Sequence, residues 1–262
     1  IDISGELTEA SYTSGGLTIS NIKTAILGTN VTSIGTNAFE NATGLTSITI
    51  PSSVTSIGNL AFKGSGLSSI TIPNSVTTIG NNAFGLCSSL GNIVFEQGIN
   101  LQEINVNTFQ QSGLTSIIIP DSVTLINAHA FKLAANLTSV TFGASSQLTT
   151  FAYESFMNTG LSSIIIPDSV TSINGSAFKN VPSLTSVTFG ANSLLQTIGI
   201  LAFNSSGLSS ITIPTSVTSV GDSAFENATS LTSVTFGANS LLQTIGNLAF
   251  KGSGLSSITI PN

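Results

Sequence analysis

The sequence predicts a β-rich solenoid, one extended domain of about eleven stacked coils. The first observation is a phenylalanine that recurs at steps of 23, 22, 25, 22, 25, 22, 25, 22 and 25 residues, a period typical of solenoids. The second is an L-x-x-I-x-I run, or a close variant of it, that comes before each ring from the second coil onward. The recurring rings belong to Phe39, Phe62, Phe84, Phe109, Phe131, Phe156, Phe178, Phe203, Phe225 and Phe250.

Residues 67–84, LSSITIPNSVTTIGNNAF, contain every part of one coil. An L-x-x-I-x-I strand comes first, and its fourth and sixth residues point inward with the two-residue alternation of a strand. A proline turn and a V-x-x-I run follow, and the V-x-x-I run is predicted to form the opposite wall. An Ala-Phe pair closes the coil. We expect the rings of successive coils to stack into a continuous aromatic spine.

Two kinds of coil alternate along the chain. The short kind has a P-[DNST]-S-V turn, as in residues 120–123, and the long kind replaces it with F-G-A-x-S-x-L, as in residues 189–195. Together they form a double repeat of 47 residues, and residues 183–199 are identical to residues 230–246 one double repeat later. Duplication of a two-coil unit explains this pattern.

The two ends of the chain differ from the repeat. Residues 1–20 lack its spacing and are predicted to form an N-terminal cap, while residues 21–262 form the solenoid. The sequence stops just after a strand, at Pro261, which predicts a fragment of a longer array. An uncovered edge strand would also allow end-to-end or edge association with another chain.

The composition argues against several classes of function. Charged residues make up only 6% of the chain, the net charge is −6, and all five basic residues are lysines. Nucleic acid is therefore an improbable partner, because phosphate and base recognition depend on basic surfaces. No apolar run approaches the ~18 residues of a membrane span, so membrane insertion is not predicted.

Few residues could carry chemistry. One histidine, His129, and one cysteine, Cys87, stand at unrelated positions of the repeat, so neither a nucleophile–base pair nor a metal site is predicted. Glu96 and Glu103 lie in the least regular coil and could approach each other, but a solvated loop is the simpler interpretation. We therefore expect no catalytic residue, no bound metal and no cofactor.

The repeat L-x-x-I-x-I-P-x-x-V-x-x-I-x-x-x-A-F-x-x-[C/small]-x-x-L resembles the BspA-like leucine-rich repeats over about residues 22–262. The resemblance implies a right-handed leucine-rich-repeat superhelix with a parallel sheet on its concave side, typically in secreted or cell-surface proteins. Several such proteins are adhesins. Family members place a cysteine three residues after the phenylalanine, and here only Cys87 does so. We interpret Cys87 as a filler of the core, since the other coils use other small residues.

The concave face is the candidate binding surface. Its outward positions form ladders of threonine and serine, and larger apolar residues interrupt them near the middle. Such ladders suit a sheet surface for structural reasons alone, because β-branched residues pack well there. The alternative is a binding platform. Its candidate residues are Thr71, Asn92, Val94, Thr115, Ser116, Ile118, Thr138, Thr141, Ser163, Ile165 and Thr188.

These observations favour a non-enzymatic extracellular or cell-surface adhesion module that presents this face to a protein or a glycan. The near-identical duplicated units leave a structural spacer or surface-coat array open as an alternative. The threonine ladders leave open a binder of ice or mineral surfaces, although a concave face fits a flat lattice poorly.

Overall fold

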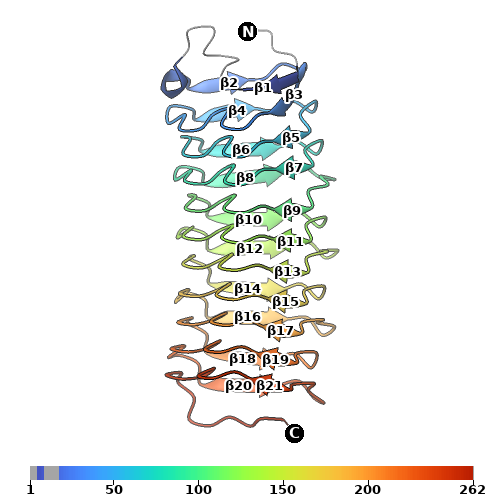
Figure 1. Ribbon diagram of the computed structural model, residues 1–262, viewed down its shortest axis with the longest axis vertical. Helices are drawn as coiled ribbons and strands as arrows, with labels where there is room; N and C mark the ends of the chain where they lie inside the picture. Colours follow the sequence, from blue (N-terminus) through green and yellow to red (C-terminus); the bar gives the residue numbers. More distant parts are fainter. Residues whose placement is uncertain (1–4, 9–17, 262) are drawn as a thin grey trace.

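The computed structural model describes residues 5–8 and 18–261, and the chain forms a column of stacked coils (Figure 1). In the described residues ten coils each contain two strands, which we call the long and the short strand; only in the first coil is the order of length reversed. Residues 255–261 begin a further coil. This confirms the predicted β-solenoid. A strand β1 (Gly5–Leu7) and a 3-10 turn η1 (Ile19–Asn21) come before the first coil.

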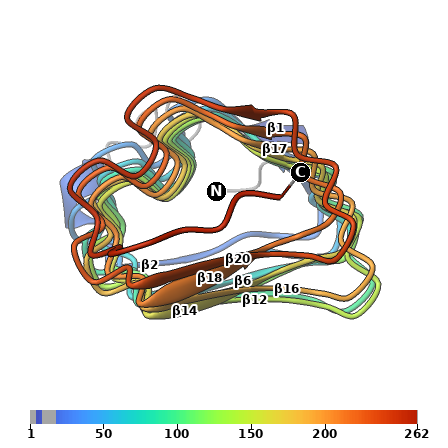
Figure 2. The same ribbon diagram turned by 90° about the horizontal axis from the view of Figure 1, so that it is seen from below.

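One wall of the column consists of the long strands, and the opposite wall consists of the short strands (Figure 2). The long strands are β2 (Thr24–Ile26), β4 (Ser47–Thr49), β6 (Ser69–Ile72), β8 (Asn92–Phe95), β10 (Ser116–Ile119), β12 (Ser139–Phe142), β14 (Ser163–Ile166), β16 (Ser186–Phe189), β18 (Ser210–Ile213) and β20 (Ser233–Phe236). The short strands are β3 (Val31–Ile34), β5 (Ser56–Ile57), β7 (Thr78–Ile79), β9 (Glu103–Ile104), β11 (Leu125–Ile126), β13 (Thr150–Phe151), β15 (Ser172–Ile173), β17 (Thr197–Ile198), β19 (Ser219–Val220) and β21 (Thr244–Ile245).

The two walls differ in how their strands pair. The short strands form a seven-stranded parallel sheet from β9 to β21, after a four-stranded sheet of β1, β3, β5 and β7. The long strands pair only two by two, as β2–β4, β6–β8, β10–β12, β14–β16 and β18–β20. The wall of long strands is therefore opened at regular intervals.

From β6 onward the openings follow the alternation of coil lengths. From β6 onward each pair joins a short coil to the long coil that follows it. At the strand entrance the backbone bond from Thr138 N to Thr115 O is 2.9 Å within a pair, while Ser162 N to Thr138 O is 3.3 Å across an opening. The corner after a long coil's strand contains two residues more than the corner of the next short coil. Across each opening the entrance bond is the last backbone bond between the two long strands, so the strands separate toward their C-terminal ends.

The predicted aromatic spine is confirmed. From Phe39 to Phe250 each ring stacks on the next, with centroids 4.8–5.6 Å apart and ring planes within 3–16°. The rings from Phe62 to Phe225 are fully buried. They belong to one continuous apolar core that runs the length of the column.

The chain turns tightly on both sides of each ring. Residues two before and two after the phenylalanine have positive φ, as at Asn82 (55°) and Leu86 (60°) around Phe84. Asparagine and glycine tolerate this left-handed conformation best, which explains why both recur here. His129 occupies one of these turn positions, with φ of 59°.

Hydroxyl groups replace charges in holding the coils together. In the S-V-T run of the short coils, Ser169 Oγ donates to Leu148 O of the preceding coil at 2.7 Å, and Thr171 Oγ1 donates to Thr149 O at 3.3 Å. The other coils with this run make corresponding serine and threonine bonds to the coil before them. The serine and threonine content of the chain is thus explained in large part by bonds between coils.

The N-terminal cap remains a prediction, because residues 1–4 and 9–17 lie outside the described residues. In the described part β1 pairs with β3 in parallel and buries Leu7. These residues extend the wall of short strands by one strand.

Ser155 offers a test of the core. It precedes the ring of Phe156, at a position that is alanine in most coils, and its Oγ is buried without a hydrogen-bond partner. An unsatisfied buried hydroxyl costs about 1–3 kcal/mol. We therefore expect Ser155→Ala to raise the free energy of unfolding by about 1 kcal/mol or more in urea denaturation. Thr108 is the control: at the same position it donates to Asn105 O at 2.8 Å. Thr108→Ala is expected to destabilise, and a loss in both variants would contradict this account.

Candidate functional site

The predicted concave face corresponds to the wall of long strands, which we call the long-strand face. All eleven candidate residues are exposed on it, within the long strands or one residue before them. The most exposed apolar candidates are Ile118 and Ile165, at 70% and 71%, and Val94 is 45% exposed. These large apolar side chains are therefore exposed to solvent on a face that is otherwise covered by hydroxyl groups.

Four equivalent grooves lie where the long strands separate. They follow β8, β12, β16 and β20, and their volumes are about 410, 410, 520 and 640 Å³. Each groove lies between the strand-end phenylalanine of a long coil and the proline turn of the next short coil. These pairs are Phe95 with Pro120, Phe142 with Pro167, Phe189 with Pro214, and Phe236 with Pro261.

The grooves bring some of the predicted residues together and leave others apart. Asn92, Val94, Ser116 and Ile118 line the first groove. Thr141 and Ile165 line the second, and Thr188 lines the third. Thr71, Thr115, Thr138 and Ser163 lie outside the linings of all four grooves.

Two of the outlying candidates have a structural role. Thr138 Oγ1 donates to Thr115 O at 3.2 Å, and Thr115 Oγ1 donates to Gly91 O at 3.3 Å. Thr46, Ser68, Ser162, Thr185 and Thr232 make the corresponding bond in other coils. This row of hydroxyls joins coil to coil, so the structural interpretation of the ladder applies to it.

The sequence reasoning missed the phenylalanines that end the long strands. Phe95, Phe142, Phe189 and Phe236 are half-buried, whereas the isoleucine at the same position of a short coil, such as Ile72, is fully buried. The signal was present in the F-G-A-x-S-x-L variant of the repeat. Its consequence, a groove beside the ring, depends on how far adjacent coils separate.

Carboxylates stand at two of the grooves. Glu96 and Asp121 line the first, and Asp168 lines the second. Glu96 Oε2 accepts a bond from the backbone N–H of Asn74 at 3.1 Å. Glu103 is separate from Glu96: its Oε2 accepts from Asn127 Nδ2 at 2.8 Å on the opposite wall. The two glutamates thus bind different neighbouring coils and do not form a joint site.

The densest group of titratable side chains lies in the turns beside the spine, away from the grooves. Glu154 Oε2 accepts from Lys132 Nζ and lies 3.3 Å from His129 Nε2. Burial raises the pKa of Glu154, but hydrogen bonds from Lys132 and Tyr153 outweigh it, so the pKa lies below its usual value. The pKa of Tyr153 is raised, first by its hydrogen bond to Glu154. This group is an ion-pair network between adjacent coils.

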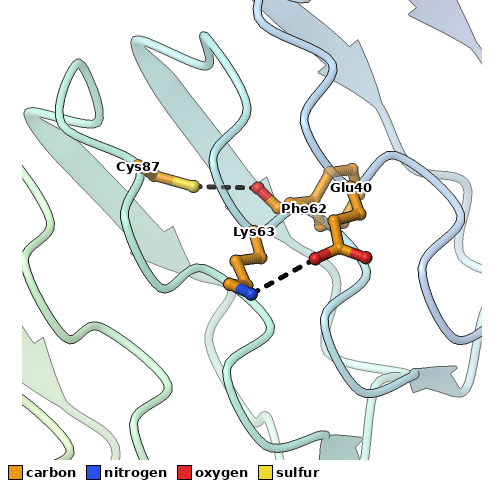
Figure 3. Close-up of polar contacts among 4 residues, drawn as sticks. All are labelled: Glu40, Phe62, Lys63 and Cys87. Atoms are coloured by element: carbon orange, nitrogen blue, oxygen red, sulfur yellow. Dashed lines mark hydrogen bonds and ion pairs between the residues drawn. The ribbon is translucent and has the colours of Figure 1, made fainter.

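Cys87 is a core residue, as predicted. Its Sγ donates to Phe62 O at 2.9 Å (Figure 3). The same Sγ lies 3.4 Å from Ser65 Oγ. Burial raises the pKa of the thiol, which keeps it protonated and unreactive. The neighbouring pair of Lys63 and Glu40, 3.3 Å apart, is the stacked ion pair of adjacent coils also drawn in Figure 3.

Over the described ranges 5–8 and 18–261, no three histidine, cysteine or acidic residues come together as metal ligands would. Within the same ranges, no helix has the length and apolar character to cross a membrane.

A family model decides the relationship that the repeat suggests. The model for the BspA type leucine-rich repeat region (6 copies) matches residues 17–138 and 149–262. The chain belongs to this family. Its BspA-type repeats thus cover nearly the whole solenoid.

Solved structures show the same fold. A leucine-rich repeat protein from Bacteroides ovatus is 25% identical, with a TM-score of 0.53 over 96% of this chain and 80% of that one. A leucine-rich repeat protein from Eubacterium ventriosum is 19% identical, with a TM-score of 0.51 over 98% and 91%. The pneumococcal vaccine antigen PcpA is 16% identical, with a TM-score of 0.54 over 91% and 72%. No curated protein matches the chain.

Proposed function

We propose that this BspA-type solenoid is a non-enzymatic binding or adhesion module that presents its long-strand face to a protein or glycan outside the cell. The observation that carries the proposal is the row of four grooves, the first two of which are flanked by the exposed side chains of Val94, Ile118 and Ile165. Concave apolar sites with a few polar groups are the usual form of a binding site. An extracellular or cell-surface location is part of the proposal, because BspA-like repeats typically occur in secreted and surface proteins.

The absence of a plausible reaction centre in the described residues supports a binding role over catalysis. The lone thiol is buried, and the histidine is held in a structural ion-pair network. The carboxylates of the grooves have no histidine, cysteine or lysine beside them among the groove-lining residues. What the grooves offer a partner is apolar contact and hydrogen bonding.

The proposal is tested by probing the purified chain against a panel of extracellular matrix proteins and a glycan array. The double variant Ile118→Lys/Ile165→Lys places two charges on the long-strand face. It is expected to weaken binding of any partner at least about ten-fold, because buried apolar contacts dominate interface energy. The matched control is Leu86→Lys/Leu133→Lys, which adds the same charge at exposed leucines beside the spine.

Equal binding by both variants would show that the long-strand face is not the site. If the panel and array give no partner while the chain assembles into ordered layers, the chain is a spacer or surface-coat array, the alternative that its duplicated 47-residue units favour.

A further inference from the structure

We propose that the four grooves together bind one extended polypeptide in the polyproline II conformation, lying along the column with every third residue in a groove. This inference rests on the proposed function and names the partner of the same face. The grooves lie at equivalent positions of the double repeat and recur after 47 residues, that is, after two coils. A partner with a matching repeat would occupy all of them.

The spacing selects the conformation of the partner. Spine rings of adjacent coils are 4.8–5.6 Å apart, so two coils advance by about 10 Å, twice the ~4.8 Å between strands. A polyproline II chain advances ~9.3 Å in three residues and then presents the same face again. In a β-strand the same face returns after ~6.7 Å, which does not fit the grooves.

The width of the partner also matters. An α-helix with side chains is ~10–12 Å across and needs a continuous trough along its axis. Here the paired strands, such as β10 and β12, separate one groove from the next. A slender polyproline II chain can cross these strands and lower one side chain into each groove.

The walls of the first two grooves favour apolar side chains over sugars. Phenylalanine, proline, isoleucine and valine line these two grooves, whereas serine and threonine make up more of the lining in the third and fourth. Sugar-binding faces usually stack exposed tryptophan or tyrosine against the ring. The chain has no tryptophan, and of its two tyrosines the described one, Tyr153, lies beside the spine. Aromatic-lined grooves of this kind are the known partners of proline-rich segments.

Charge gives the bound chain a direction. Glu96 and Asp121 stand at the first groove and Asp168 at the second, whereas no acidic residue lines the third or fourth. No lysine lines any of the four. A basic residue at one end of the partner would therefore lie at the first groove.

The hydroxyl groups suit such a partner as well. A polyproline II backbone makes no internal hydrogen bonds, so its carbonyl groups need outside donors. The outward hydroxyls of Thr141 and Thr188, beside the second and third grooves, are exposed and available for that purpose.

The test uses fluorescent peptides of one, two, three or four Ile-Pro-Pro triplets preceded by two lysines, titrated into the full chain. We expect Kd to fall about five-fold or more with each triplet up to the fourth, because each added groove is filled intramolecularly. Ile118→Lys should weaken the longest peptide about ten-fold or more. Glu96→Gln/Asp121→Asn should weaken it less and reduce its dependence on salt. Leu133→Lys is the control expected to bind like the unchanged chain.

Three results would overturn the inference. A peptide of the same composition with its isoleucines two and four residues apart could bind equally well. A β-1,4-linked glucose oligosaccharide could bind instead, with the same sensitivity to Ile118→Lys. The triplet peptides could also fail to bind at all. If in that last case another partner is still lost in Ile118→Lys/Ile165→Lys, the proposed function stands and only the polyproline II partner is wrong.

Discussion

Replacing Phe156 with alanine is expected to lower the free energy of unfolding by about 3–5 kcal/mol, the usual range for a buried phenylalanine. Its ring is fully buried and lies 4.8 Å from that of Phe131 and 5.4 Å from that of Phe178, in both cases stacked. Phe151 also contacts it edge-on at 5.8 Å. The substitution would leave a cavity in the spine, and neighbouring coils on both sides are held in place by the same stack.

Urea denaturation of the full chain measures this loss, and Phe142→Ala is the matched control. Phe142 ends a long strand, is half-buried beside a groove, and touches Phe151 at 6.0 Å. Its removal should cost clearly less than that of Phe156. Because a solenoid's stability is a sum of coil and neighbour terms, the loss at Phe156 should also make the middle coils the first to unfold. Equal losses of unfolding free energy in the two variants would show that a stacked ring of the spine stabilises the fold no more than a half-buried phenylalanine does.

The spine and the coil order were predictable because each depends on a local pattern. A phenylalanine at a fixed position of every coil can only stack on its equivalents once the coils stack. The recurrence of Phe84 and its counterparts therefore predicts the position of the core from the sequence pattern alone. The small residue three positions later, Cys87 in one coil, was placed in the core by the same reasoning and is fully buried there.

The grooves were not predictable in the same way. The exposed residues that flank them, Val94, Ile118 and Ile165, could be identified from the alternation of the strands. That Val94 and Ile118 line one groove, while Ile165 lines another, depends on which strands separate. The residue pattern gives the length of each corner, but it does not specify which neighbouring strands separate.

The hydroxyl ladder shows a related difficulty. From the sequence, Thr138 and Thr141 both read as outward-facing threonines of one strand region. In the structure Thr138 donates to the backbone of the preceding coil, whereas Thr141 lines a groove. Both residues are threonines, so the residue type does not separate the two roles. What separates them is whether the hydroxyl comes within hydrogen-bonding distance of a backbone carbonyl.

Gly207→Ala is the second substitution with a large expected effect, a loss of about 1–3 kcal/mol from overpacking. A Cβ at Gly207 would lie 2.0 Å from the carbonyl oxygen of Pro182 and 2.9 Å from its carbon. Both atoms belong to the backbone of the preceding coil, so they cannot rotate away. The coil would have to shift relative to its neighbour, which strains the adjacent stack.

The reduced entropy of the unfolded chain opposes this loss of stability at Gly207, but its contribution is smaller. Alanine restricts the unfolded chain more than glycine does, which by itself would stabilise by about 0.4–1 kcal/mol. Gly91→Ala isolates this term, because a Cβ there would have no neighbour closer than 3.9 Å, at Ser68 O. We expect Gly91→Ala to be neutral or slightly stabilising and Gly207→Ala to be destabilising in thermal and urea denaturation. Equal shifts in stability of the same sign for the two variants would contradict this account. They would mean that the coils can move apart at the turn before Leu208 without loss of stability, so that the close stacking of these turns does not contribute to it.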